Sequence, residues 1–192
     1  MTMQRRQFLE TTSCAGLGLA VPRVSWFTQS AESPDPYKKL KSSRYLAKVK
    51  VETRISDAEI FTEGPAVDHL GNVYFTNIPV NKILKWDADS RELSVFKADS
   101  KAANGLRFAM NGDLLVCEGG SGKVIRINMK NGKVSTLADQ FRGKGLQAPN
   151  DLDFDSGGRI YFSSRTNNPD LQKENLRAVY RVDPDGEIHQ LL

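Results

Sequence analysis

Short runs of alternating hydrophobic and polar residues recur along the chain and predict β-strands. Many of these runs are separated by a turn with glycine at a fixed place, as at Gly71, Gly112 and Gly158. An apolar run, a turn glycine that can take a positive φ and a second apolar run together predict a β-hairpin. Helical periodicity is weak throughout, so the pattern favours an all-β protein.

The hairpins belong to a repeat with three copies, each followed by two more strand-like runs. The copies occupy residues 63–75, 104–116 and 150–162 and align without a gap. They start 41 and 46 residues apart, a spacing typical of four-stranded β-propeller blades. A solenoid of stacked hairpins is the alternative, although such repeats are generally shorter, at roughly 20 to 30 residues.

The composition is that of a chain able to bury a core, with 39% hydrophobic and 26% charged residues. The best candidate for a membrane span, Cys14–Val21, is too short to cross a bilayer. Of 27 basic and 23 acidic residues, three and one lie in the first thirty positions, which leaves +2 for the rest. That balance argues against a nucleic-acid partner, and we expect no membrane partner once a signal peptide is removed.

The amino terminus has the order of an export signal. Arg5 and Arg6 precede Phe-Leu, and a weakly apolar stretch of small residues, 15–21, follows. This order resembles a twin-arginine signal cleaved near Ser30, and an amphipathic basic helix at the start of a cytosolic protein is the alternative. We therefore expect a periplasmic or secreted protein. The expected parts are a signal peptide (1–30), a linker (31–45) and a partial propeller (46–192).

Glu63, Asn104 and Asn150 occupy the same position in the three copies. Equivalent positions of propeller blades form a ring, so these side chains are expected to project into one mouth of the central channel. A carboxylate and two amides are hard oxygen donors, which suit Ca²⁺, Mg²⁺ or Mn²⁺ better than a zinc site of His and Cys. Alternatively, they are turn residues whose side-chain oxygens bond nearby backbone.

Other polar and reactive residues are weaker candidates for a function. Cys117 follows an apolar run and is predicted to be a small buried hydrophobic residue. Glu118 is either a substrate contact near the channel or a solvated strand end. His69 and His189 are predicted to lie on the surface, and residues 183–186 are predicted to form a turn between outer strands of the third blade.

Three segments resemble the first three blades of the SMP-30/gluconolactonase/luciferin-regenerating-like family. They are Glu63–Phe75, Ala103–Glu118 and Pro149–Phe162. The resemblance covers Ile55 to Leu192. It implies a six-bladed β-propeller, of which about three blades are present here, with one divalent cation at the channel mouth.

The resemblance also implies residue roles. Glu63 and Asn150 would bind the metal, with Ca²⁺ as the first choice and Mg²⁺, Mn²⁺ or Zn²⁺ as alternatives. Asn104 would contact the substrate, a small-molecule sugar lactone. The implied reaction is lactone hydrolysis, with the metal as Lewis acid and a carboxylate as general base.

The family's aspartate base is expected beyond Leu192. We therefore expect this chain to be the amino-terminal half of a longer enzyme and inactive by itself. Two other functions stay open, a non-catalytic propeller that binds a ligand or protein partner, and hydrolysis of a phosphoester by the same scaffold.

Overall fold

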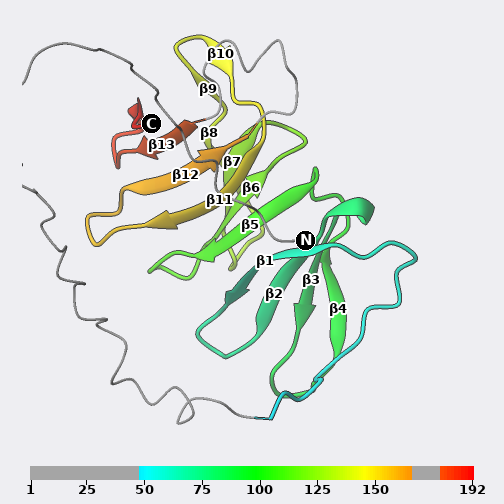
Figure 1. Cartoon of the computed structure of the whole chain (residues 1–192). Helices are drawn as coiled ribbons and strands as arrows, with labels where there is room; N and C mark the ends of the chain where they lie inside the picture. Colours follow the sequence, from blue (N-terminus) through cyan, green and yellow to red (C-terminus); the bar gives the residue numbers. More distant parts are fainter. Residues whose placement is uncertain (1–47, 166–177) are drawn as a thin grey trace, which may run out of the picture. The chain divides into compact units, whose positions relative to one another are not determined.

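Three antiparallel sheets of four strands follow one another along the chain (Figure 1). The computed structural model describes residues 48–165 and 178–192, so the expected signal peptide and linker lie outside the described residues. Within the described part the chain forms no α-helix, and no helix there is long and apolar enough to span a membrane. The prediction of an all-β partial propeller is confirmed.

Each sheet, called a blade below, has its strands side by side in sequence order. Blade 1 consists of β1 (Thr62–Val67), β2 (Val73–Asn77), β3 (Lys82–Trp86) and β4 (Leu93–Lys97). Blade 2 consists of β5 (Ala103–Phe108), β6 (Leu114–Glu118), β7 (Lys123–Ile127) and β8 (Val134–Ala138). Blade 3 consists of β11 (Pro149–Phe154), β12 (Ile160–Ser164), β13 (Ala178–Val182) and β14 (Ile188–Gln190). The connections contain a short 3₁₀ helix, η2 (Ile78–Val80), and a hairpin of β9 (Gln140–Phe141) and β10 (Lys144–Gly145).

Blade 2 lies between the other two blades and is packed on both faces. On β6, Leu114 and Val116 belong to the core shared with blade 1, whereas Leu115 and Cys117 belong to the core shared with blade 3. Because side chains alternate between the faces of a strand, burial on both faces requires apolar residues at consecutive positions. Cys117 is fully buried, as predicted. Burial raises the pKa of its thiol, which therefore stays protonated.

Aromatic rings fill both cores. Between blades 1 and 2, the ring of Tyr74 meets those of Phe96 and Phe108 edge-on, each at a centroid distance of 5.1 Å. In the core shared by blades 2 and 3, Tyr180 stacks on Phe162 at 5.3 Å. Such pairs add about 0.5–1.5 kcal/mol each beyond the area that they bury.

The segment before β1 is tied to blade 1 by polar contacts. Asp57 accepts a hydrogen bond from Nδ2 of Asn77 at 3.0 Å and forms an ion pair with Lys82. The Oδ1 of Asn77 in turn accepts the backbone N–H of Phe61 at 3.0 Å. These contacts hold the chain against β2 and β3 directly before β1 begins, and so they fix the position of Glu63.

The turns between strands are closed by Asp and Asn side chains. Asp87 Oδ1 accepts backbone N–H groups in the β3–β4 turn, and Asn128 Oδ1 does so in the β7–β8 turn. The N–H of Gly186 donates to the carbonyl of Asp183 at 2.9 Å between β13 and β14. The prediction of a turn at residues 183–186 is therefore confirmed.

Candidate functional site

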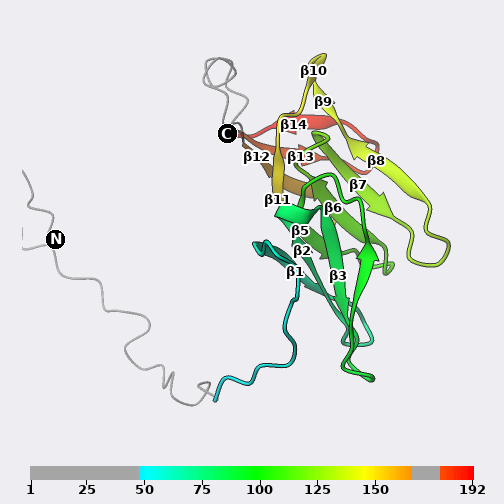
Figure 2. The same ribbon diagram turned by 90° about the vertical axis from the view of Figure 1, so that its right-hand side faces the viewer.

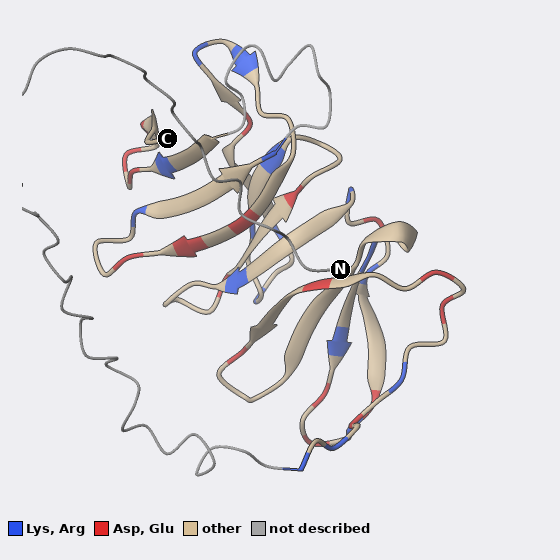
Figure 3. Ribbon diagram, in the orientation of Figure 1, with Lys and Arg blue, Asp and Glu red and all other residues tan. Residues whose placement is uncertain are grey.

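The first strands of the three blades lie next to one another, with β5 between β1 and β11 (Figures 1 and 2). Glu63, Asn104 and Asn150 each occupy the second position of these strands. The strands also contain acidic residues, whose ribbon is coloured red on β1 and β11 in Figure 3. The repeat thus places its three equivalent oxygen-bearing residues at the same end of three neighbouring strands.

Each of these strands changes its pairing register directly at or after the candidate residue. In β5, Ala103 pairs with Glu118 and Leu106 with Val116, so one extra residue is inserted on the β5 side. The same shift occurs in β1 and in β11. A bulge of this kind re-aims a side chain and is common beside functional sites. This bulge was not predicted, although the alternation of apolar residues breaks at 104–105.

Two glycines let neighbouring strands approach at this point. A Cβ on Gly64 would lie 2.2 Å from the carbonyl oxygen of Asn104. A Cβ on Gly105 would lie 2.7 Å from Cα of Asp151 and 2.8 Å from the carbonyl oxygen of Asn150. Each glycine follows a candidate residue and contacts the backbone of the next candidate. The backbone at Glu63 therefore lies close to that at Asn104, and the backbone at Asn104 lies close to that at Asn150.

A buried hydroxyl joins the first two positions. Thr76 is fully buried on β2, and its Oγ1 lies 3.1 Å from the carbonyl oxygen of Glu63 and 3.2 Å from that of Asn104. The hydroxyl proton can be shared between these two acceptors. Thr76 thus fixes the spacing of blades 1 and 2 at the candidate site, and no local motif pointed to it.

The candidate side chains are not used in turns. Glu63 is exposed, Asn150 is partly buried and Asn104 is 8% exposed. Within the described ranges, no hydrogen bond or ion pair is formed by the side chains of these three residues. All three lie within strands, so the alternative interpretation as turn residues is wrong. Their assignment as metal or substrate ligands stays a prediction.

Glu118 is buried and is not a solvated strand end. It pairs with Ala103 across β5 and β6, and its side chain is only 7% exposed. Its Oε2 accepts a hydrogen bond from Oγ of Ser121 at 2.7 Å. A buried carboxylate therefore lies on β6, on the residue that pairs with the neighbour of Asn104 in the chain. His69, in contrast, is exposed as predicted.

The donor set restricts the cations that fit. In the part of the chain that the structure describes, no three His, Cys, Asp or Glu side chains are grouped so that they could hold a metal ion. The candidates supply one carboxylate and two amide oxygens, all without a partner among residues 48–165 and 178–192. Such a mixed oxygen set fits Ca²⁺ and other hard cations and does not fit a zinc cage of thiolates and imidazoles.

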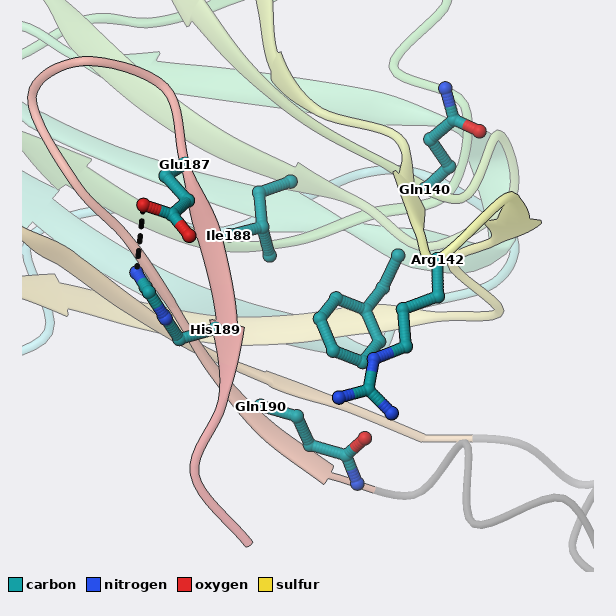
Figure 4. A pocket seen from close by; sticks show the side chains of 7 residues that line it. Gln140, Arg142, Glu187, Ile188, His189 and Gln190 are labelled. Carbon is teal, nitrogen blue, oxygen red and sulfur yellow. Dashed lines mark ion pairs between the residues drawn. The ribbon is translucent and has the colours of Figure 1, made fainter.

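One cavity lies far from these residues, at the outer strand of blade 3. It has a volume of about 460 Å³ and lies between the β9–β10 hairpin and β14 (Figure 4). Its charged groups have partners within it, since His189 Nε2 lies 3.7 Å from Glu187 Oε2 and the guanidinium of Arg142 lies 5.1 Å from the ring of Phe141. His189 also lies 3.1 Å from Asp183 and is partly buried, so it is less exposed than predicted.

Comparison with known proteins assigns the region that contains the three blades to a family. The family model of the SMP-30/Gluconolactonase/LRE-like region matches residues 61–192. The chain belongs to this family. The match begins just before β1 and includes all three blades.

Two gluconolactonases and one calcium-binding protein are among its relatives. The gluconolactonase of Zymomonas mobilis is 27% identical over 158 residues, which cover 72% of this chain and 44% of that protein. The structure of a Xanthomonas campestris gluconolactonase is 24% identical, with a TM-score of 0.62, covering 70% of this chain and 48% of the other. Regucalcin of Agrobacterium tumefaciens, described as calcium-binding, is 16% identical, with a TM-score of 0.54, covering 74% and 45%. The chain thus spans about half the length of the relatives that it matches.

Proposed function

We propose that the protein is a lactone hydrolase that depends on a divalent metal and acts on a sugar lactone. One observation carries the proposal. Glu63, Asn104 and Asn150 hold equivalent positions in three packed blades, and their side-chain oxygens have no partner among the described residues. The family membership and the gluconolactonase relatives support the reaction class.

The proposed role of each residue follows from the chemistry of its side chain. Glu63 and Asn150 would hold the cation, because a carboxylate contributes charge and an amide carbonyl contributes a neutral hard oxygen. A bound divalent cation would polarise the lactone carbonyl. Asn104, on the strand between them, would orient the substrate through its amide. Its N–H₂ can donate to a hydroxyl or carbonyl oxygen of the sugar.

Ca²⁺ is the proposed cation. Ca²⁺ prefers oxygen ligands such as the carboxylate of Glu63 and the amide oxygen of Asn150, and Mg²⁺, Mn²⁺ and Zn²⁺ are the alternatives to compare. The calcium-binding relative supports this choice at the level of the fold. No described residue is assigned as the general base. For these 192 residues we therefore propose binding of metal and lactone with little or no turnover.

Metal binding is tested by thermal unfolding of the full chain with increasing CaCl₂. A ligand at about 100 times its Kd stabilises the folded state by about 2.7 kcal/mol. For a domain of this size, that corresponds to a rise in Tm of roughly 5–10 °C. Glu63→Gln keeps the shape and removes the charge, so it should abolish most of the rise. Glu92→Gln, an exposed acid in the β3–β4 turn, should leave it unchanged.

Addition of gluconolactone in the presence of calcium should raise Tm further, and Asn104→Ala should remove that second increment. Absence of any shift with Ca²⁺, Mg²⁺, Mn²⁺ or Zn²⁺ would contradict the metal site and favour a non-catalytic propeller. Rapid lactone hydrolysis by the 192-residue chain, followed by release of acid in a pH-indicator assay, would show that the general base is among these residues.

A further inference from the structure

Every blade carries a basic residue at the fourth position of its third strand. In blade 1, Nζ of Lys85 donates to Oδ2 of Asp87 at 2.8 Å. In blade 3, Nη2 of Arg181 donates to Oδ2 of Asp183, also at 2.8 Å. The corresponding residue in blade 2 is Arg126. In blades 1 and 3 the cation is therefore neutralised by an aspartate two residues later.

Blade 2 lacks this aspartate. Asn128 takes its place, and its Oδ1 accepts the backbone N–H groups of Lys130 and Asn131, both at 3.1 Å. Over the described ranges, the guanidinium of Arg126 forms no hydrogen bond or ion pair, and its Nε is shielded from solvent without an acceptor. A buried donor of this kind costs free energy unless an acceptor reaches it. Arg126 is thus a cation without a partner from its own blade.

The cross-strand neighbour of the basic residue also differs in blade 2. The cross-strand pairs are Tyr74–Lys85 in blade 1, Tyr161–Arg181 in blade 3 and Leu115–Arg126 in blade 2. The ring of Tyr74 fills the space between blades 1 and 2 and contacts Phe108. Phe154 is the equivalent of Phe108 in blade 3, but it faces the smaller Leu115. The first turn residue of the hairpin, an aspartate in blades 1 and 3, is also replaced in blade 2, by Ala109.

These replacements coincide with a cavity of about 230 Å³ between blades 2 and 3. Its apolar lining consists of Ala109, Met110, Leu115, Phe154 and Ile160, and its one cationic side chain is Arg126. Asp155 also lines it, but its Oδ2 already accepts hydrogen bonds from Arg159 Nε at 2.6 Å and Tyr161 Oη at 3.1 Å. The unpaired charge in the cavity is therefore positive. A dry cavity of about 150 Å³ can hold benzene, so an aromatic ring with a carboxylate fits this volume.

Blades 1 and 3 supply a phenol ring and a carboxylate to this place from their own chain, and blade 2 supplies neither. We propose that the cavity binds a small aromatic carboxylate. Its carboxylate pairs with the guanidinium of Arg126, a geometry in which two parallel hydrogen bonds form readily. Its ring packs against Leu115, Phe154 and Ile160, and the exposed Met110 adapts to it at the rim.

This site is separate from the proposed lactone site. The cavity lies beside the β5–β6 and β11–β12 turns, at the opposite end of the first strands from Glu63, Asn104 and Asn150. Binding there does not rest on the proposed hydrolase function. Glu63→Gln should therefore leave it unchanged.

The test is calorimetric titration of the full chain with phenylacetate, compared with 2-phenylethanol, which has the same ring and no charge. We expect phenylacetate to bind with a Kd on the order of 1 mM or below, and 2-phenylethanol to bind at least tenfold more weakly. Arg126→Gln should weaken phenylacetate at least tenfold. Lys85→Gln, at the equivalent position of blade 1, should leave it unchanged.

Leu115→Tyr is the second variant. It gives blade 2 the tyrosine that blades 1 and 3 have at this position, and the larger ring fills the cavity while Arg126 is kept. It should also prevent binding, with the fold checked by circular dichroism. If Arg126→Gln does not fold, the proposal is tested by Leu115→Tyr and by the comparison of phenylacetate with 2-phenylethanol. Equal binding of phenylacetate and 2-phenylethanol, unchanged binding by Leu115→Tyr, or no saturable binding by the wild type would overturn the proposal.

Discussion

At the scale of single residues, the candidate site depends on a glycine, because only a residue without a Cβ lets the neighbouring strand come so close. Gly64 has a φ of +53° and faces the backbone of β5 with no room for a Cβ. Its neighbours at this point are a carbonyl oxygen, a Cα atom and a backbone nitrogen, which cannot rotate away as a side chain can. A methyl group would therefore push blade 1 away from blade 2 at the position of Glu63 and Asn104.

Gly64→Ala should destabilise the protein by about 3 kcal/mol or more, since strain in the left-handed region of about 1–2 kcal/mol adds to an overpacked contact. Gly112→Ala is the matched control, because Gly112 also has a positive φ, +82°, but no atom lies within 4 Å of its Cβ position. It should cost only about 1–2 kcal/mol. Urea unfolding measures both, and equal losses would show that the close approach of the strands contributes little.

The hydroxyl of Thr76 makes a second contribution at this scale. Thr76→Val keeps the shape and removes the only donor that reaches both Glu63 O and Asn104 O from β2. We expect a loss of about 1–2 kcal/mol in the free energy of unfolding. Thr136→Val, at an exposed position of β8, should change it by less than about 0.5 kcal/mol. A loss at Thr76 no larger than that control would exclude a role for the shared hydrogen bond.

At the scale of elements, the β3–β4 turn depends on the ionised carboxylate of Asp87. Nζ of Lys85 and then the backbone N–H of Ser90 hold the pKa of Asp87 at about 2, below its ordinary value of 3.8. A carboxyl whose pKa is lower in the folded state stabilises the fold above the unfolded pKa. That contribution is lost as the pH falls from about 4 to about 2.

Asp87→Asn should therefore flatten the decline in stability between pH 4 and pH 2 and lower the stability at neutral pH. The free energy of unfolding, measured by urea denaturation across this range, gives the slope. Asp89→Asn, in the same turn, is the control and should keep the wild-type slope. A variant at Asp87 that retained the full decline would show that other carboxyl groups cause it.

The strands and hairpins could be predicted from the sequence, whereas the contacts between strands of different blades could not. Alternating apolar residues define a strand locally, which is why the hairpins at 63–75, 104–116 and 150–162 were identified correctly. The contact of Thr76 with Asn104 joins residues from different blades, and no local pattern encodes it. The bulges were missed because a single extra residue changes the alternation only at 104–105 and its equivalents.

At the scale of the whole molecule, the three blades share one design but differ where function is proposed. Blade 2 is packed on both faces and therefore carries the consecutive apolar residues of β6. The same blade replaces a tyrosine and two aspartates found in blades 1 and 3, which opens the cavity beside Arg126. Comparing copies of the repeat could have found Arg126 from sequence alone. The volume of the cavity depends on how blades 2 and 3 pack, and it required the structure.

Export is also a property of the whole molecule, and we propose that Arg5 and Arg6 direct it. Lysine keeps the positive charge of arginine but lacks the planar guanidinium. A twin-arginine signal should therefore fail in the double variant Arg5→Lys/Arg6→Lys, although both positive charges are kept. Immunoblots of periplasmic and cytoplasmic fractions from a Gram-negative host should show the uncleaved double variant in the cytoplasm. Arg23→Lys, at the far side of the apolar stretch, should still be exported and cleaved. Normal export of the double variant would contradict a twin-arginine signal. Wild-type protein that stays uncleaved in the cytoplasm would favour the alternative, an amphipathic basic helix at the start of a cytosolic protein.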